Sequence, residues 1–213
     1  MIGNQTVDLL TLSVALTLLP AAAVLVTSFT KIAIVFALVK NAIGIQQVPS
    51  TLVTNSLALI MTVFVMAPVL REVSDNMSQQ KHAHQDRIEW VVQSAAEPVT
   101  KFMKRYVDPE EQTRLIATAK RIWPAALAER ARPDDFFILV PSFAISEISA
   151  AFKIGFLLYL AFVAIDLIVA NILMAMGMIM FSPTIVSIPL KIILFVMADG
   201  WSRLVQALLL TYQ

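Results

Sequence analysis

The sequence predicts an all-α protein of membrane-associated helical hairpins with a central polar helical insertion. Of its 213 residues, 58% are hydrophobic and only 15% are charged, and the mean hydropathy is +0.77. Typical soluble domains carry about 25% charged residues. The charge is also unevenly placed, because residues 71–135 hold 22 of the 31 charged side chains. These observations divide the chain into an apolar helical hairpin at 1–70, a charged helical domain at 71–140 and a C-terminal apolar hairpin region at 141–213.

The first hairpin is predicted from two uncharged runs and the turn between them. Residues 9–30 carry no charge, and about 20 apolar residues are enough to cross a bilayer as a helix. Glycine, proline and amide side chains then indicate a turn centred on Gln46 and Gln47. Ser50 can cap a second helix, which we expect to run over 51–67 and to end near Pro68.

The central segment carries helical periodicity and strong helix-boundary signals. Four apolar residues fall at i, i+3, i+4 and i+7 on one helix face, with Pro98 in the first turn; they are Val99, Phe102, Met103 and Tyr106. A second helix begins at Asp108, where an N-cap is followed by Pro109 and two acids. Trp123 and Pro124 end that helix.

The C-terminal region is predicted to form a second hairpin. A helix that begins at Pro141 and Ser142 leads into 167–190, which is uncharged for 24 residues. Ser182 and Pro183 interrupt that run, so the tip of this hairpin is expected near 177–183.

Four of the ten methionines lie within 174–180, at the end of that apolar run and near the predicted tip. Met is unbranched and adaptable, so these side chains either fill gaps between packed helices or close an opening without a rigid fit. Their position at the tip of a hairpin favours closing an opening, because residues at a tip are less often buried deep in a core. The residues of interest are Met178, Ile179 and Met180.

Charged residues recur inside the C-terminal apolar region, at Glu147, Lys153, Asp166 and Lys191. An unpaired charge in the middle of a membrane costs several kcal/mol, so these groups are expected to pair or to face protein or water. Two interpretations remain open: a proton or ion relay, and assembly charges buried between subunits. Asp166 and Lys191 lie 25 residues apart, on either side of the predicted tip, and we expect them to be partners.

Several classes of function are excluded by composition. The chain has no cysteine and only two histidines, His82 and His84, so a metal centre lacks ligands. No phosphate-binding glycine loop and no nucleophile with a histidine partner are present. A net charge of +1 gives no reason to expect a nucleic acid partner. The sequence therefore predicts a non-enzymatic protein without a cofactor.

Ordered sequence motifs along nearly the whole chain resemble the FliP/SctR family, the export-gate proteins of flagella and of type III secretion injectisomes. The match is weak only between about 72 and 135. The motifs are KNAIGIQQVP at 40–49, FVMAPV at 64–69, FKIGFLLYL at 152–160, IDL at 165–167, MAMGM at 174–178 and KIILFVMADGW at 191–201.

The resemblance implies a pore subunit for unfolded protein substrates. Five copies would form a ring, joined by SctS/FliQ-like and SctT/FliR-like subunits and other export apparatus proteins in the bacterial inner membrane. The segment matching Met178, Ile179 and Met180 would be a methionine-rich gasket; family members usually have Met where Ile179 stands. The short chain, with no sign of a cleaved signal at its start, is closer to the injectisome branch.

Two rival hypotheses remain. The first is a proton- or ion-coupled small-solute transporter that uses Asp166 and Lys191 as relay groups; it predicts inverted repeats, and no self-similarity is visible between the two apolar halves. The second is a structural membrane scaffold without a pore.

Overall fold

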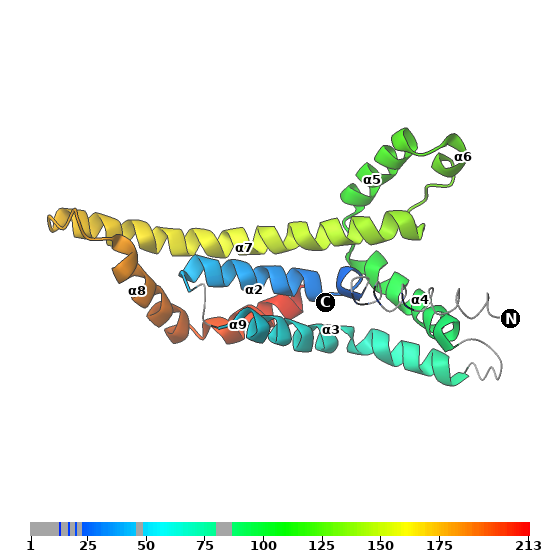
Figure 1. Ribbon diagram of the computed structural model, residues 1–213, viewed down its shortest axis with the longest axis horizontal. Coiled ribbons are helices and arrows are strands. Elements are labelled where there is room, and N and C mark those ends of the chain that lie inside the picture. Colours follow the sequence, from blue (N-terminus) through cyan, green and yellow to red (C-terminus); the bar gives the residue numbers. More distant parts are fainter. Residues whose placement is uncertain (1–12, 14–16, 18–19, 21–22, 46–48, 80–86) are drawn as a thin grey trace. The chain divides into compact units, whose positions relative to one another are not determined.

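The computed structural model describes residues 13, 17, 20, 23–45, 49–79 and 87–213, and all regular structure within them is α-helical. This confirms the all-α prediction. The helices follow one another as α2 (Phe29–Ile43), α3 (Thr51–Gln79), α4 (Arg87–Tyr106), α5 (Pro109–Ile122), α6 (Ala125–Ala128), α7 (Phe136–Ala175), α8 (Pro183–Met197) and α9 (Gly200–Leu210) (Figure 1).

The chain divides into two compact units that are discontinuous in sequence. Unit 1 comprises Met1–Thr30 and Met66–Glu147, and unit 2 comprises Lys31–Val65 and Ile148–Gln213. The long helices α3 and α7 each contribute one part to each unit. The threefold division by composition at 1–70, 71–140 and 141–213 describes the sequence and remains a prediction.

Unit 1 is held together by a small aromatic core and by polar contacts between its helices. Phe102 of α4 packs edge-on against Phe143 of α7, with ring centroids 5.8 Å apart. The Ser146 hydroxyl accepts a hydrogen bond of 2.9 Å from the backbone N–H of Asp108. Asp108 in turn caps α5, because its carboxylate accepts from the N–H of Glu110. The predicted start of this helix, and its end at Trp123, are thus confirmed.

Three prolines predicted at or near helix ends lie inside helices instead. Pro68, Pro98 and Pro141 are interior to α3, α4 and α7. Proline costs a helix about 3 kcal/mol, partly because the carbonyl four residues earlier loses its donor. In α4 that carbonyl belongs to Ser94, and the Asn76 side-chain amide donates to it at 3.3 Å. At Pro98 this substitute donor, together with helical sequence on both sides, outweighs the proline signal for a helix end.

Unit 2 packs around α2, which is buried along one side. Its core residues Val35, Phe36 and Val39 are at most 1% exposed. Phe36 meets Trp201 of α9 edge-on at 6.0 Å. At Gly155 of α7 an added Cβ would lie 2.3 Å from the Leu38 side chain, so only glycine allows α7 to approach α2 this closely (Figure 1).

Two helices in the described residues are long and apolar enough to cross a membrane. They are Thr51–Ser78, which is nearly all of α3, and the 40-residue α7. The bent pair α8 and α9, at 64°, would be a third if it forms one span. A 40-residue helix is about 60 Å long, twice the roughly 30 Å of a hydrocarbon core. α7 is therefore too long for an ordinary span.

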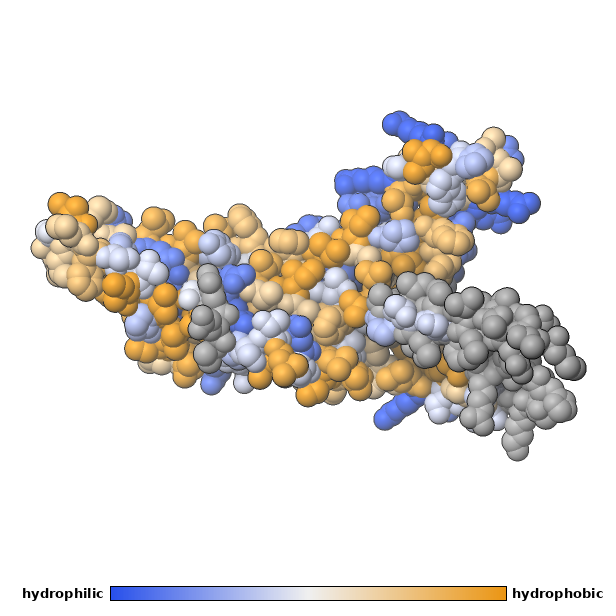
Figure 2. All heavy atoms as spheres, viewed as in Figure 1, coloured by the Kyte–Doolittle hydropathy of each residue, from blue (hydrophilic) through white to orange (hydrophobic). Residues whose placement is uncertain are grey.

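Apolar side chains also cover much of the outside of unit 2 on the face that Figure 2 shows, whereas hydrophilic side chains gather on α5 and α6. In α7 only 17% of the most apolar window is buried within the chain. Surfaces of this kind in a folded protein mark contacts with lipid or with other chains.

Candidate functional site

The methionine cluster lies at the end of α7, in a loop of residues 176–182 that we call the Met loop. Gly177 has φ +75°, and its N–H donates to the Met174 carbonyl. The next N–H, of Met178, donates to the Leu173 carbonyl at 2.9 Å. This hydrogen-bond pattern is a Schellman motif, in which a glycine in the left-handed conformation ends the helix. The predicted tip near 177–183 is confirmed, and Pro183 begins α8.

The Met loop is apolar and yet exposed. The exposed fraction is 81% for Ile179 and 102% for Met180, and Met178 is 39% exposed. These residues follow the last turn of α7, and an added Cβ at Gly177 would touch nothing within 4 Å. Plain packing within the chain therefore does not explain the cluster. Adaptable apolar side chains presented in this way suit contact with something outside the chain.

A buried polar cluster holds three helices of unit 2 together, and we call it the Lys191 clasp. The Lys191 ammonium on α8 donates to the Asp166 carboxylate on α7 at 2.6 Å and to the Ala42 carbonyl at 3.1 Å. The Lys191 side chain is 5% exposed, whereas that of Asp166 is 43% exposed. The predicted partnership of Asp166 with Lys191 is confirmed, and it forms within one chain.

The Ala42 carbonyl is available because it lies in the last turn of α2, where backbone carbonyls have no partner inside the helix. A cation at this end also complements the helix dipole. Close packing brings Lys191 there. Gly44, just beyond the helix with φ +93°, would place a Cβ 2.9 Å from the Ile188 side chain of α8. A glycine is needed at this position both for the turn and for the approach of α8.

The other predicted site residues are not gathered at the clasp. Glu147 on α7 is buried, with 2% of its surface exposed. Lys153, further along α7, is exposed and forms no ion pair within the part of the chain that the structure describes. Gln46 and Gln47, the predicted turn, lie outside the described residues. Among the described residues no group of three or more carboxylate, histidine or cysteine side chains is placed to hold a metal ion.

Two lysines of α2 have surroundings that sequence reasoning left open. Lys31 is 5% exposed and Lys40 is 6% exposed. The Lys31 ammonium donates to the Thr211 hydroxyl at 3.4 Å and lies 3.8 Å from the centre of the Tyr212 ring. Aromatic rings attract cations through their negative faces. A lysine beside an apolar run indicates that the charge needs a polar contact. The sequence does not reveal which one, because Thr211 is 180 residues away.

Comparison with known proteins now decides the family. The sequence model of the FliP family matches residues 12–208. The chain belongs to the FliP family. This membership confirms the resemblance inferred from the ordered motifs.

Three similar bacterial proteins align with most of the chain. The hypersensitivity response secretion protein HrcR of Ralstonia nicotianae is 42% identical over 210 residues, which is 97% of each chain. The Yop proteins translocation protein R of Yersinia pestis is 41% identical over 199 residues, 92% of each chain. The virulence protein YscR of Salmonella typhimurium is 39% identical over 188 residues, 87% of each chain. All three names refer to secretion, translocation or virulence.

Proposed function

We propose that this chain is the pore-forming subunit of a type III secretion export gate in the bacterial inner membrane. Five copies form a ring with SctS/FliQ-like and SctT/FliR-like subunits and with other export apparatus proteins. The ring conducts unfolded protein substrates, and the Met loops of the copies meet around its axis. The secretion and translocation names of the FliP-family relatives support the general role.

The exposed Met loop is the observation that carries the proposal. Met178, Ile179 and Met180 sit at the end of the 40-residue α7. A narrow apolar ring excludes ions by dewetting. A passing polypeptide can displace Met side chains, which have several accessible rotamers, and the ring closes again behind it. Sealing and adaptability are both requirements of an export pore.

The charged residues of α7 fit assembly better than transport of ions. The Asp166 carboxylate pairs with Lys191, but 43% of the Asp166 side chain is exposed. It therefore remains accessible to a neighbouring subunit. Lys153 is exposed on an apolar helix, where a free charge is costly in contact with lipid. We assign Glu147, Lys153, Asp166 and Lys191 to the interfaces and internal clasps that fix the register of the ring.

The transporter hypothesis receives no support from the family or from the names of the relatives. Its proposed relay group Lys191 is buried and already donates to a carboxylate and to a backbone carbonyl. Such contacts hold the three helices together, and they leave the Lys191 ammonium closed to a solute.

Disulfide crosslinking tests the arrangement, because the chain contains no cysteine of its own. Ile179→Cys is introduced into the full-length protein in its assembled complex, and Ile122→Cys, also well exposed but on α5, is the control. Because each copy then carries a single thiol, oxidation should link copies in pairs through residue 179 and not through residue 122. Intact complexes that never crosslink at 179 would show that the Met loops do not converge, as expected of a scaffold without a pore.

A further inference from the structure

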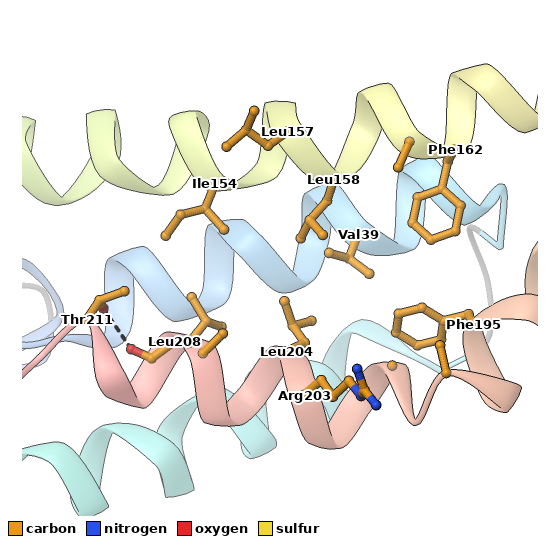
Figure 3. Close-up of a pocket in the computed structure, with 14 residues that line it drawn as sticks. Val39, Ile154, Leu157, Leu158, Phe162, Phe195, Arg203, Leu204, Leu208 and Thr211 are labelled. Atoms are coloured by element: carbon orange, nitrogen blue, oxygen red, sulfur yellow. Dashed lines mark hydrogen bonds between the residues drawn. The ribbon is translucent and has the colours of Figure 1, made fainter.

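An open apolar groove runs between α7 and α9 in unit 2, and α2 forms its floor (Figure 3). Its volume is about 500 Å³, within the range of sites that hold ligands or protein side chains. Fourteen residues line it: Val39, Ile154, Leu157, Leu158, Ala161, Phe162, Phe195, Ala198, Gly200, Arg203, Leu204, Ala207, Leu208 and Thr211.

The two walls of the groove carry the spacing of helix-packing faces. On α7 the lining residues fall at i, i+3, i+4, i+7 and i+8 from Ile154. On α9 they fall at i, i+3, i+4, i+7 and i+8 from Gly200, and the C-cap Thr211 continues the row. Such rows are the ridges into which another helix packs. Small residues, Ala161 on one wall and Ala207 on the other, are exposed and allow a backbone to approach closely.

The groove is formed before anything enters it. Its deepest side chains are fixed within the chain: Val39 is 1% exposed, Leu208 2% and Leu204 7%. At one end Phe162 and Phe195 pack together, with ring centroids 6.2 Å apart. Only the rims are open, as at Leu157, which is 68% exposed.

Arg203 is the single charged side chain among the lining residues. It is exposed, and within the described part of the chain no carboxylate pairs with it. Covering a guanidinium with apolar surface is costly unless a partner neutralises it and accepts its hydrogen bonds. A carboxylate does both, because it matches the planar fork of arginine.

We infer that this groove binds an apolar α-helix of another protein chain, and that a carboxylate on that helix pairs with Arg203. The wall spacing and the small residues favour a helix over an acyl chain, which needs neither. The inference concerns unit 2 alone and does not depend on which residues line the pore.

Binding of designed helices to the full-length protein in detergent micelles tests it. The probes are Leu/Ala-rich membrane-type peptides with one central Glu, and matched peptides with Gln or Lys in its place. The Glu peptide should bind the native protein about tenfold more tightly than the Gln peptide. In Arg203→Glu the order should reverse, so that the Lys peptide binds best. Lys120→Glu, the same kind of charge reversal at an exposed position of α5 outside the groove, is the control and should leave the Glu preference unchanged.

A second variant tests the shape of the groove independently of the charge on Arg203. Ala161→Leu fills the opening at an exposed position and should weaken all three peptides together. The inference is wrong if the native protein binds the Glu and Gln peptides with equal affinity. It is also wrong if Ala161→Leu leaves the affinities of both peptides unchanged. A third outcome would assign the groove to lipid. In that case the protein does not distinguish the three peptides, and an anionic phospholipid stays bound to the native protein but is lost from Arg203→Gln.

Discussion

The Met loop and the Lys191 clasp place their side chains in opposite ways. Met180 and Ile179 are apolar and exposed, whereas Lys191 is charged and only 5% of its side chain is exposed. The usual distribution puts apolar groups inside and charges outside. Here both regions depart from it within one unit, with the loop immediately before the helix that carries Lys191.

The difference assigns each region its role. The buried Lys191 ammonium has both of its hydrogen-bond acceptors inside the chain. The Lys191 clasp therefore stabilises the packing of α2, α7 and α8 within one subunit. The exposed apolar side chains of the Met loop have no packing partner inside the chain, and under the proposed function other chains cover them. Changes to the loop should therefore alter the assembled pore, and changes to the clasp should alter the folded subunit.

The largest effect is expected from the loop itself. Replacing Met178, Ile179 and Met180 together by glycine would remove the proposed apolar constriction while α7 keeps its Gly177 end. The complex should assemble, since these side chains contribute nothing to the core of the subunit, but the membrane should leak small ions. Conductance in planar bilayers measures this. Closed-level conductance through intact complexes would place the constriction elsewhere.

Local signals in the sequence were enough to predict the ends of several elements near these regions. Ser50 before Thr51, Asp108 before Pro109, and Gly177 with Pro183 beyond it all mark true boundaries. Each works through hydrogen bonds within a few residues, which is why sequence alone reveals them. The pairing of Asp166 with Lys191 was also predictable, because two charges interrupting apolar runs require a partner.

Contacts that depend on packing could not be predicted. The Ala42 carbonyl enters the clasp only because α8 approaches the end of α2 at Gly44. The substitute donor for Pro98 comes from Asn76, on another helix, and without it the proline suggested a boundary. The Arg203 groove combines residues of four helices, and no local pattern links them.

The second prediction concerns the clasp and distinguishes its two charges. Asp166→Asn leaves the Lys191 ammonium buried without a counter-charge, which should cost about 3–5 kcal/mol of subunit stability. Lys191→Met should cost less, about 1–3 kcal/mol, because it removes the donor to a backbone carbonyl but leaves an Asp166 that is 43% exposed. Thermal unfolding of the detergent-solubilised subunit and native gels of the complex measure both.

The double variant is the control for this prediction. Asp166→Asn with Lys191→Met removes both charges, so it should be more stable than Asp166→Asn alone. Purely additive losses would show that the two side chains are not coupled in the folded subunit. Normal assembly of both single variants with loss of secretion would instead favour a relay.

A smaller effect on stability is expected from changes at Gly177, where α7 ends and the Met loop begins. Gly177→Ala should cost about 1–2 kcal/mol, because φ of +75° is unfavourable for a residue with a Cβ although there is space for the atom. Gly177→Asn should cost less, since asparagine tolerates this conformation. Unfolding measurements on the two variants compare them. Equal losses would mean that the backbone conformation is not what limits this position.

The smallest effect should come from Ile179→Met, which makes residues 178–180 three consecutive methionines. Ile179 is 81% exposed, so subunit stability should change by less than about 0.5 kcal/mol. The effect belongs to transport: isoleucine is stiff at χ1, whereas methionine changes rotamer easily. Secretion of a bulky substrate should therefore become faster in Ile179→Met and stay unchanged in Ile179→Val, which keeps the β-branch. Equal rates in all three proteins would mean that side-chain flexibility at the Met loop does not limit the passage of substrate.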